Sequence, residues 1–335
     1  INCTLTDAEG KEIGRAVSHG ENIAIPVAAP VLWNAEQPYL YTLTLRAGAE
    51  TIEQKVGIRT ISVENGKILI NGKQVKFRGV NRHDSNPYTG ATVTREDVIR
   101  DLQLMKESNV NAIRTSHYPN APYFPELCNE YGFYMIAEAD LESHGVGTLY
   151  TNDGHDCMGY IAQDDAWAES ILDRQKRNVI RDKNQSAVIF WSLGNESGYG
   201  GNFEDAGRWV KAYDPTRLLH YEASIYDSAG YHNDVSMLDV MSRMYADTEW
   251  VKEYCEDRRM RKPFIQCEFI HAMGNGPGDI HDYMELMYKY DKFCGGFVWE
   301  WCDHATWEGK AADGRDIFHY GGDAGEFPHD GNFCM

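Results

Sequence analysis

Two glutamates in this chain each follow a short apolar run, and each has an amide or imidazole side chain close by in the sequence. Asn195 and Glu196 follow one run, and Glu268 closes another, with His271 three residues later. Carboxyl and imidazole groups can transfer protons, and amide groups donate and accept hydrogen bonds. This set could therefore carry acid–base and nucleophilic chemistry. A structural alternative stays open for the first pair, because Asn195 could simply cap a following helix.

The elements that must position the two acids are predicted strands. Residues 188–193 and 263–268 are runs rich in β-branched and aromatic residues, typical of strands buried on both faces of a parallel sheet. The carboxyl ends of barrel strands carry the catalytic groups of α/β-barrel enzymes. If Glu196 and Glu268 end two strands of one barrel with carboxyl groups about 5 Å apart, they form the pair that a retaining glycoside hydrolase uses.

The chain from residue 63 onward alternates strand and helix patterns. Eight runs predict strands: 75–81, 110–115, 133–138, 188–193, 218–222, 240–243, 264–267 and 296–299. Helical patterns lie between several of them, at 165–181, 203–213, 247–256 and 279–290, and Thr94 with Asp97 resembles a capping box that opens another helix. Such a series implies a parallel sheet, and eight strands imply closure into a (β/α)8 TIM barrel.

The first part of the chain predicts a separate all-β unit. Segments 22–27, 40–46 and 51–59 read as strands. Because roughly 100 residues make a whole sandwich, we expect residues 1–62 to be a partial immunoglobulin-like β-sandwich domain and 63–335 to be the TIM-barrel catalytic domain. Asn-Gly pairs at 65–66 and 71–72 predict hairpin turns where the two meet.

Further polar and aromatic side chains follow the predicted strands, namely His83, His117, Tyr245 and Trp299. Imidazoles bind sugar hydroxyls well, and an indole ring stacks on the C–H face of a pyranose. Each has a structural alternative, since the histidines could be ordinary loop residues and Trp299 could belong to the core. Their joint occurrence after strands favours a sugar pocket at one rim.

Glu142 and His144 are a candidate cation site. Alternate residues of an extended loop can converge on an ion, and a carboxylate from another strand would complete the ligand set. With few further ligands and no thiolate cluster, such a set points to Mg²⁺ or Mn²⁺. Ordinary surface polarity is the alternative.

Composition limits the partners and the environment of the chain. A net charge of −19 over 335 residues argues against nucleic acid and acidic membranes as partners. Apolar runs of the roughly 20 residues that a membrane helix needs do not occur. The eight cysteines form no Cys-x-x-Cys pair, so we expect reduced thiols and a cytoplasmic location. Because the sequence starts at Ile1, we expect it to be a piece of a longer protein.

Six segments together resemble the large bacterial β-galactosidases of glycoside hydrolase family 2. They occur in the order of that family, at 78–83 (RGVNRH), 116–120 (SHYPN), 142–145 (ESHG), 191–197 (WSLGNES), 267–275 (CEFIHAMGN) and 295–299 (GGFVW). The resemblance runs from about residue 31 to residue 335. It implies a retaining hydrolase that removes terminal β-D-galactosyl residues from small-molecule or oligosaccharide substrates, and a homo-oligomer in the full-length protein.

The resemblance also implies residue roles. Glu196 would be the general acid/base and Glu268 the nucleophile. An active-site Mg²⁺ would be held by Glu142, His144 and Glu196, and a Na⁺ would take the carbonyl oxygen of Phe333. The galactose pocket would be shaped by His83, His117, Asn195, Tyr245, His271 and Trp299.

The chain also departs from the family pattern. It lacks the amino-terminal jelly-roll domain that supplies an aspartate to Na⁺ and to the sugar site, ends before the next Na⁺ ligand, and lacks the carboxy-terminal β domains. We therefore expect Na⁺ binding only in the full-length protein. The alternatives are a β-glucuronidase, a β-mannosidase and a non-catalytic sugar-binding relative. The segments at 191–197 and 267–275 resemble β-galactosidases and argue against the first two, and the presence of both glutamates argues against the third.

Overall fold

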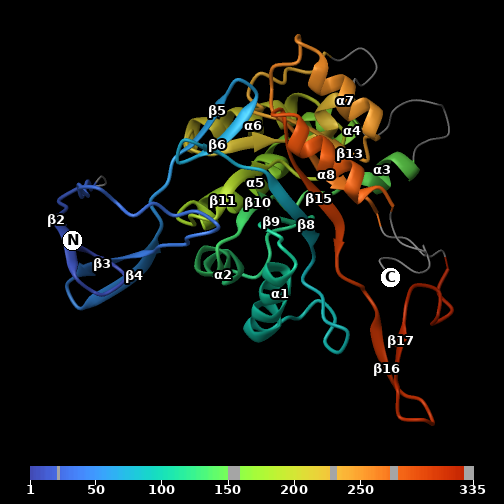
Figure 1. Ribbon diagram of the computed structural model, residues 1–335, viewed down its shortest axis with the longest axis horizontal. Helices are drawn as coiled ribbons and strands as arrows, with labels where there is room; N and C mark the ends of the chain where they lie inside the picture. Colours follow the sequence, from blue (N-terminus) through green and yellow to red (C-terminus); the bar gives the residue numbers. More distant parts are fainter. Residues whose placement is uncertain (21–22, 150–158, 227–231, 272–277, 328–335) are drawn as a thin grey trace.

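The computed structural model describes residues 1–20, 23–149, 159–226, 232–271 and 278–327 (Figure 1). Its amino-terminal unit is one antiparallel sheet, set apart from the rest of the molecule in Figure 1. The sheet has the order β2-β1-β3-β4, with β1 (Asn2–Thr6), β2 (Glu12–Val17), β3 (Tyr41–Ala47) and β4 (Glu50–Val56). A single sheet of this kind agrees with the expected partial sandwich.

Two details of this unit differ from the prediction. The expected strand at 22–27 is wrong over its described part, because residues 23–27 form no strand. Pro26 lies within it, and proline has no N–H group to join a ladder. The strands β1 and β2 were not predicted, although Cys3 and Leu5 alternate into the core as a strand requires.

A small three-stranded sheet leads into the barrel, and it confirms the predicted hairpins. It contains β5 (Ile61–Glu64), β6 (Lys67–Ile70) and β7 (Lys73–Gln74). The tight turns use the two Asn-Gly pairs, with φ values of 52° and 75° at Asn65 and Gly66 and of 54° and 73° at Asn71 and Gly72. These left-handed conformations suit asparagine and glycine.

The main domain confirms the predicted parallel barrel. Its eight strands are β8 (Phe77–Arg82), β9 (Ala112–Thr115), β10 (Tyr134–Glu138), β11 (Val188–Ser192), β12 (Leu218–His220), β13 (Met241–Met244), β14 (Phe264–Phe269) and β15 (Phe293–Trp301). Neighbours pair in parallel, and β15 pairs with β8, which brings the last strand beside the first. The strands β12 and β13 stand at the two ends of the sheet order, and Asp239 N–H, two residues before β13, donates to the Leu219 carbonyl of β12 at 2.9 Å.

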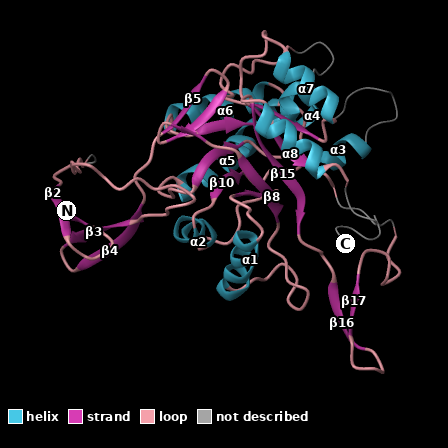
Figure 2. Ribbon diagram, in the orientation of Figure 1, coloured by secondary structure: helices cyan, strands magenta, loops and turns pink. Residues whose placement is uncertain are grey.

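Helices lie around these strands (Figure 2). They are α1 (Arg95–Glu107), α2 (Phe124–Tyr131), α3 (His144–Leu149), α4 (Gly159–Gln163), α5 (Ala168–Asp182), α6 (Gly201–Tyr213), α7 (Thr248–Glu256) and α8 (Ile280–Lys289), with 3₁₀ turns η2 (Asp165–Trp167) and η3 (Glu222–Ile225). The capping box of Thr94 and Asp97 opens α1 as predicted. The hairpin of β16 (Thr306–Lys310) and β17 (Asp316–His319), which was not predicted, extends away from the barrel in Figure 1.

Two composition-based expectations can be compared with the described residues. The six described cysteines, Cys3, Cys128, Cys255, Cys267, Cys294 and Cys302, are free thiols. Among the described helices, none combines the length and the apolar character needed to cross a bilayer.

Candidate active site

The two predicted glutamates lie at the carboxyl-terminal ends of β11 and β14. Glu268 is part of β14 and is buried, with 4% of its surface exposed. Glu196 lies beyond the end of β11, in the left-handed region at a φ of 35°, and its side chain is 31% exposed. One acid is therefore held within the protein, while the other can exchange protons with solvent.

Glu268 accepts a hydrogen bond on each oxygen. Arg114 Nη1 donates to Oε1 and the Tyr245 hydroxyl donates to Oε2, each at 2.8 Å. His117 Nε2 lies 3.7 Å from Oε1. Burial, reinforced by the charge of Glu268, raises the pKa of Tyr245, so this phenol remains a donor at neutral pH. Donors on both sides fix the orientation of the Glu268 carboxyl group.

Arg114 connects the two strand ends. Its Nη2 donates to Asn195 Oδ1 at 2.7 Å, and Asn195 precedes Glu196. Asn195 in turn donates from Nδ2 to Glu142 Oε2 at 2.6 Å. A single buried guanidinium thus contacts Glu268 directly and binds the amide side chain of the residue before Glu196, which links the two strand ends.

A second acid, Glu138 at the end of β10, balances the charge of Arg114. Both side chains are fully buried, and they form a bidentate pair with distances of 2.7 and 2.9 Å. Burial favours the neutral acid, but the Arg114 charge and hydrogen bonds from His117 and Ser192 outweigh it and hold the pKa of Glu138 at about 2. Glu138 therefore stays ionised, and Arg114 stays oriented.

Five predicted ring side chains form a wall next to these acids. Trp299 stacks on His117, with ring centroids 5.1 Å apart and planes 12° apart. His83 meets Trp299 edge-on at 5.5 Å. His271 lies 6.1 Å from Trp299 and 5.9 Å from Tyr245 between ring centroids. The structure thus brings together rings from five strand ends that the sequence predicts separately.

The candidate cation ligands also meet. Donor atoms of Glu142, His144 and Glu196 all lie within 4.8 Å of one another, and His144 Nδ1 contacts Glu196 Oε2 directly. Burial raises the pKa of Glu142, and the neighbouring charge of Glu196 adds to this effect. A bound cation would relieve this crowding of carboxylates. The remaining predicted ligand, Phe333, lies outside the described residues.

Two family models match this chain. Residues 61–335 match the family model for the TIM barrel domain of glycosyl hydrolases family 2, and residues 3–59 match a second model of glycosyl hydrolases family 2. The chain belongs to glycosyl hydrolase family 2. The family 2 resemblance predicted from the six segments is therefore confirmed.

Similar proteins include several β-galactosidases. The β-galactosidase of Actinobacillus pleuropneumoniae is 51% identical over 325 residues, which cover 91% of this chain and 32% of that protein. The β-galactosidase of Staphylococcus xylosus is 46% identical over a match that covers 100% of this chain and 34% of that protein. This family 2 chain thus spans about a third of the length of the curated relatives it matches. A solved structure of β-D-glucuronidase from Dictyoglomus thermophilum shares the fold, with a TM-score of 0.70 and 24% identity. The match covers 91% of this chain and 58% of that chain.

Three site residues of the family 2 chain were not assigned from sequence. Arg114 lies inside a predicted strand, where a charge between apolar residues is itself a signal, because a buried charge needs a partner. Glu138 and Glu222 each follow an apolar strand run, as Glu196 and Glu268 do. Glu222 Oε1 accepts the backbone N–H of Glu196 at 2.9 Å. Position alone could not separate these supporting acids from the predicted pair.

We expect Glu138→Gln to lower the free energy of unfolding by about 3–5 kcal/mol at pH 7, because Arg114 loses its bidentate partner while buried. The pKa of Glu138 is about 2 in the fold against an ordinary 4.5, so its contribution is complete above pH 4.5 and is lost as the pH falls towards 2. Urea unfolding followed by circular dichroism at pH 7, 5 and 3 measures this contribution.

The matched control is Asp140→Asn, two residues further along, because the Asp140 side chain is 68% exposed. This variant should unfold like the parent chain at all three pH values. Equal stability of Glu138→Gln and the parent at pH 7, or a stability gap that does not narrow at pH 3, would contradict the assignment of Glu138.

Proposed function

We propose that this chain is the catalytic part of a β-galactosidase that cleaves terminal β-D-galactosyl residues with retention of configuration. The observation that carries the proposal is the shared contact of Arg114, which binds Glu268 on β14 and the Asn195 amide next to Glu196 after β11. Double displacement needs two carboxyl groups that can reach one anomeric carbon, and the shared Arg114 contact supports this pairing. The identity to β-galactosidases over most of the chain supports galactose as the sugar.

In the first step, Glu196 gives its proton to the glycosidic oxygen while a Glu268 oxygen attacks the anomeric carbon. The bond to the leaving group breaks, and a covalent galactosyl ester with Glu268 forms. In the second step, Glu196 takes a proton from a water molecule, which attacks the same carbon and frees Glu268. The larger exposure of Glu196 suits its part, because it must be reprotonated in every cycle.

The remaining pocket residues would bind the sugar. Trp299 offers an indole face to the apolar side of the ring, and the imidazoles of His83, His117 and His271 offer donors and acceptors to its hydroxyls. Asn195 and Tyr245 are already oriented by Arg114 and Glu268. Hydrogen bonds that strengthen as charge develops on the ring would add to the rate.

Mg²⁺ fits the cluster of Glu142, His144 and Glu196. Two carboxylates and one imidazole are a donor set that Mg²⁺ accepts while it keeps several waters. When bound, the ion would supply positive charge next to the acid/base and tune its proton affinity. Independently of any ion, Asn195 holds Glu142 in place through its amide.

We expect Glu142→Gln to raise the Mg²⁺ concentration for half-maximal binding and activity by about 10–100-fold, because a charged ligand becomes neutral. Isothermal titration with Mg²⁺ after chelator treatment, together with the rate on an aryl galactoside, measures both effects. Asp140→Asn is the control, since this nearby acid is paired with Arg174 at 3.0 Å and faces solvent. If chelation and Glu142→Gln both leave binding and rate unchanged, the ion does not belong here.

We expect Glu222 to act as a positioning residue for Glu196. Glu222 Oε1 accepts the backbone N–H of Glu196. Glu196 has a positive φ, which residues other than glycine rarely adopt, so this hydrogen bond helps to stabilise its backbone conformation. Burial raises the pKa of Glu222 to about 8, so Gln is a close mimic at neutral pH. Glu222→Gln should retain kcat/KM within a few-fold, whereas Glu222→Leu should lose about 10–100-fold, because a buried donor is left unpaired. Similar losses in both variants would contradict this role.

A β-glucuronidase is the second candidate, since a solved β-D-glucuronidase shares the fold. A panel of aryl β-galactoside, β-glucuronide and β-mannoside substrates, given to the full-length protein, distinguishes the sugars. Proton NMR of the first product shows whether its anomeric configuration is β. We expect turnover of the galactoside above the other sugars, with β-galactose formed first. An α product, or galactoside binding without turnover, would overturn the proposal.

A further inference from the structure

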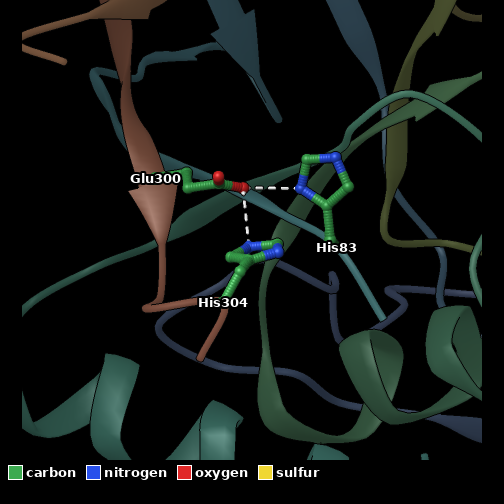
Figure 3. A group of neighbouring side chains, drawn as sticks. All are labelled: His83, Glu300 and His304. Atoms are coloured by element: carbon green, nitrogen blue, oxygen red, sulfur yellow. Dashed lines mark hydrogen bonds and ion pairs between the residues drawn. The ribbon is translucent and has the colours of Figure 1, made fainter. Parts of the chain in front are cut away.

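A second cluster of imidazole and carboxylate side chains lies where the barrel closes. His83 directly follows β8, Glu300 belongs to β15, and His304 lies four residues after Glu300. Because β15 pairs with β8 up to the contact of Trp301 with Arg82, residues 217 positions apart come together. Figure 3 shows both imidazoles turned towards the Glu300 carboxyl group.

The two imidazoles converge on the same carboxylate oxygen. His83 Nδ1 lies 2.5 Å and His304 Nε2 lies 3.2 Å from Glu300 Oε2. Although this second distance is short, His304 Nε2 forms no hydrogen bond of acceptable geometry with any described residue. A tetrahedral ion with bonds of about 2.0–2.2 Å separates its ligands by roughly 3.3 Å. The His304 contact already has this spacing, and the His83 contact needs to open by less than about 1 Å.

The charge and burial of the cluster also favour a cation. The Glu300 side chain is 2% exposed, while His83 and His304 are 23% and 29% exposed, so solvent reaches the imidazole side. A buried carboxylate therefore faces two imidazoles on its solvent side.

The donor types separate this cluster from the predicted Mg²⁺ site. Two imidazoles and one carboxylate suit Zn²⁺, Co²⁺ and Ni²⁺, whereas oxygen-rich sets suit Mg²⁺ and Mn²⁺. We propose that His83, Glu300 and His304 form a second metal site, which takes a divalent transition-metal ion of the Zn²⁺ class. The site itself does not depend on the proposed function.

One consequence does rest on the proposed function. His83 is expected to contact the sugar and meets the Trp299 ring edge-on. An ion on its Nδ1 would fix this imidazole towards Glu300 and place positive charge at the pocket wall. Transition-metal ions at this site should therefore inhibit in competition with the galactoside, and His304→Gln should relieve that inhibition.

The test is a Co²⁺ titration of untagged, full-length protein followed by visible absorption. A Glu142→Gln background weakens the other ion site, so that the first equivalent of Co²⁺ reports mainly on the cluster of His83, Glu300 and His304. We expect saturable d–d bands at one equivalent. Adding His304→Gln or Glu300→Gln should weaken Co²⁺ binding by at least about tenfold, because a ligand is lost. Circular dichroism confirms that each variant is folded.

The control variant is His319→Gln in the same background, since His319 on β17 is a partly exposed histidine whose carboxylate contact, with Glu308, is 3.8 Å long. It should leave the Co²⁺ bands unchanged. Two results overturn the site: no saturable bands in the Glu142→Gln protein, or bands that neither His304→Gln nor Glu300→Gln weakens. The readout is binding, so failure here is distinct from failure of the hydrolase proposal.

Discussion

Glu268→Gln should reduce turnover of an aryl β-galactoside by roughly 10⁴-fold or more, comparable to the loss of other covalent nucleophiles. The amide is nearly the same size as the carboxyl group, so its oxygen can still accept from Arg114 and its NH2 group can donate to the Tyr245 oxygen, but an amide oxygen cannot form the galactosyl ester. Steady-state rates at substrate saturation measure the effect. The fold should be retained, which circular dichroism and a thermal melt check.

A smaller variant, Glu268→Ala, gives a stereochemical test of the same role. A small anion such as azide can enter the space of the missing carboxyl group and attack the anomeric carbon from that side. The product should be the α-galactosyl azide, because only one displacement has occurred. Glu285→Gln on α8, whose parent side chain is 70% exposed, is the control and should keep full activity. Substantial hydrolysis by Glu268→Gln, or a β-azide from Glu268→Ala, would remove Glu268 from the nucleophile position.

Glu196→Gln should slow cleavage in proportion to the need of the leaving group for a proton. General acid catalysis contributes about 10²–10⁴-fold, so galactosides with poor leaving groups should lose that much. A dinitrophenyl galactoside, whose leaving group needs no proton, should still form the galactosyl ester rapidly. Because the second step then lacks its base, a burst of phenol followed by a slow steady state is expected in stopped-flow absorbance.

Azide again separates the two acids. With Glu196→Gln, it should speed the slow step and give the β-galactosyl azide, since it attacks the galactosyl ester from the side that water uses. Asp140→Asn serves as the nearby control. Equal losses on good and poor leaving groups, or an α-azide product, would show that Glu196 is not the acid/base.

Local sequence patterns predicted the barrel fold because each buried barrel strand is a short run of apolar residues. The eight apolar runs correspond to β8 through β15, and the Asn-Gly pairs gave the hairpins, since left-handed turns need those residues. The strands β1 and β2 were missed because short half-exposed strands carry a weak signal. The strand predicted at 22–27 is wrong over residues 23–27, because Pro26 interrupts an otherwise strand-like run.

The sequence alone also determined which side chains stand at strand ends, and hence that Glu196, Glu268 and the ring residues could share one rim. It could not determine which charges pair. Arg114 contacts Glu138, Asn195 and Glu268 from three other strand ends, and these contacts depend on the height and direction of each side chain in the closed barrel.

The cluster of His83, Glu300 and His304 depended on tertiary structure in the same way. Its members are neighbours only because β15 returns to β8, a pairing across more than 200 positions that no local periodicity encodes. Strand character is a property of a few consecutive residues, so sequence reveals it. Pairing of buried groups is a property of barrel closure, so only the folded chain decides it.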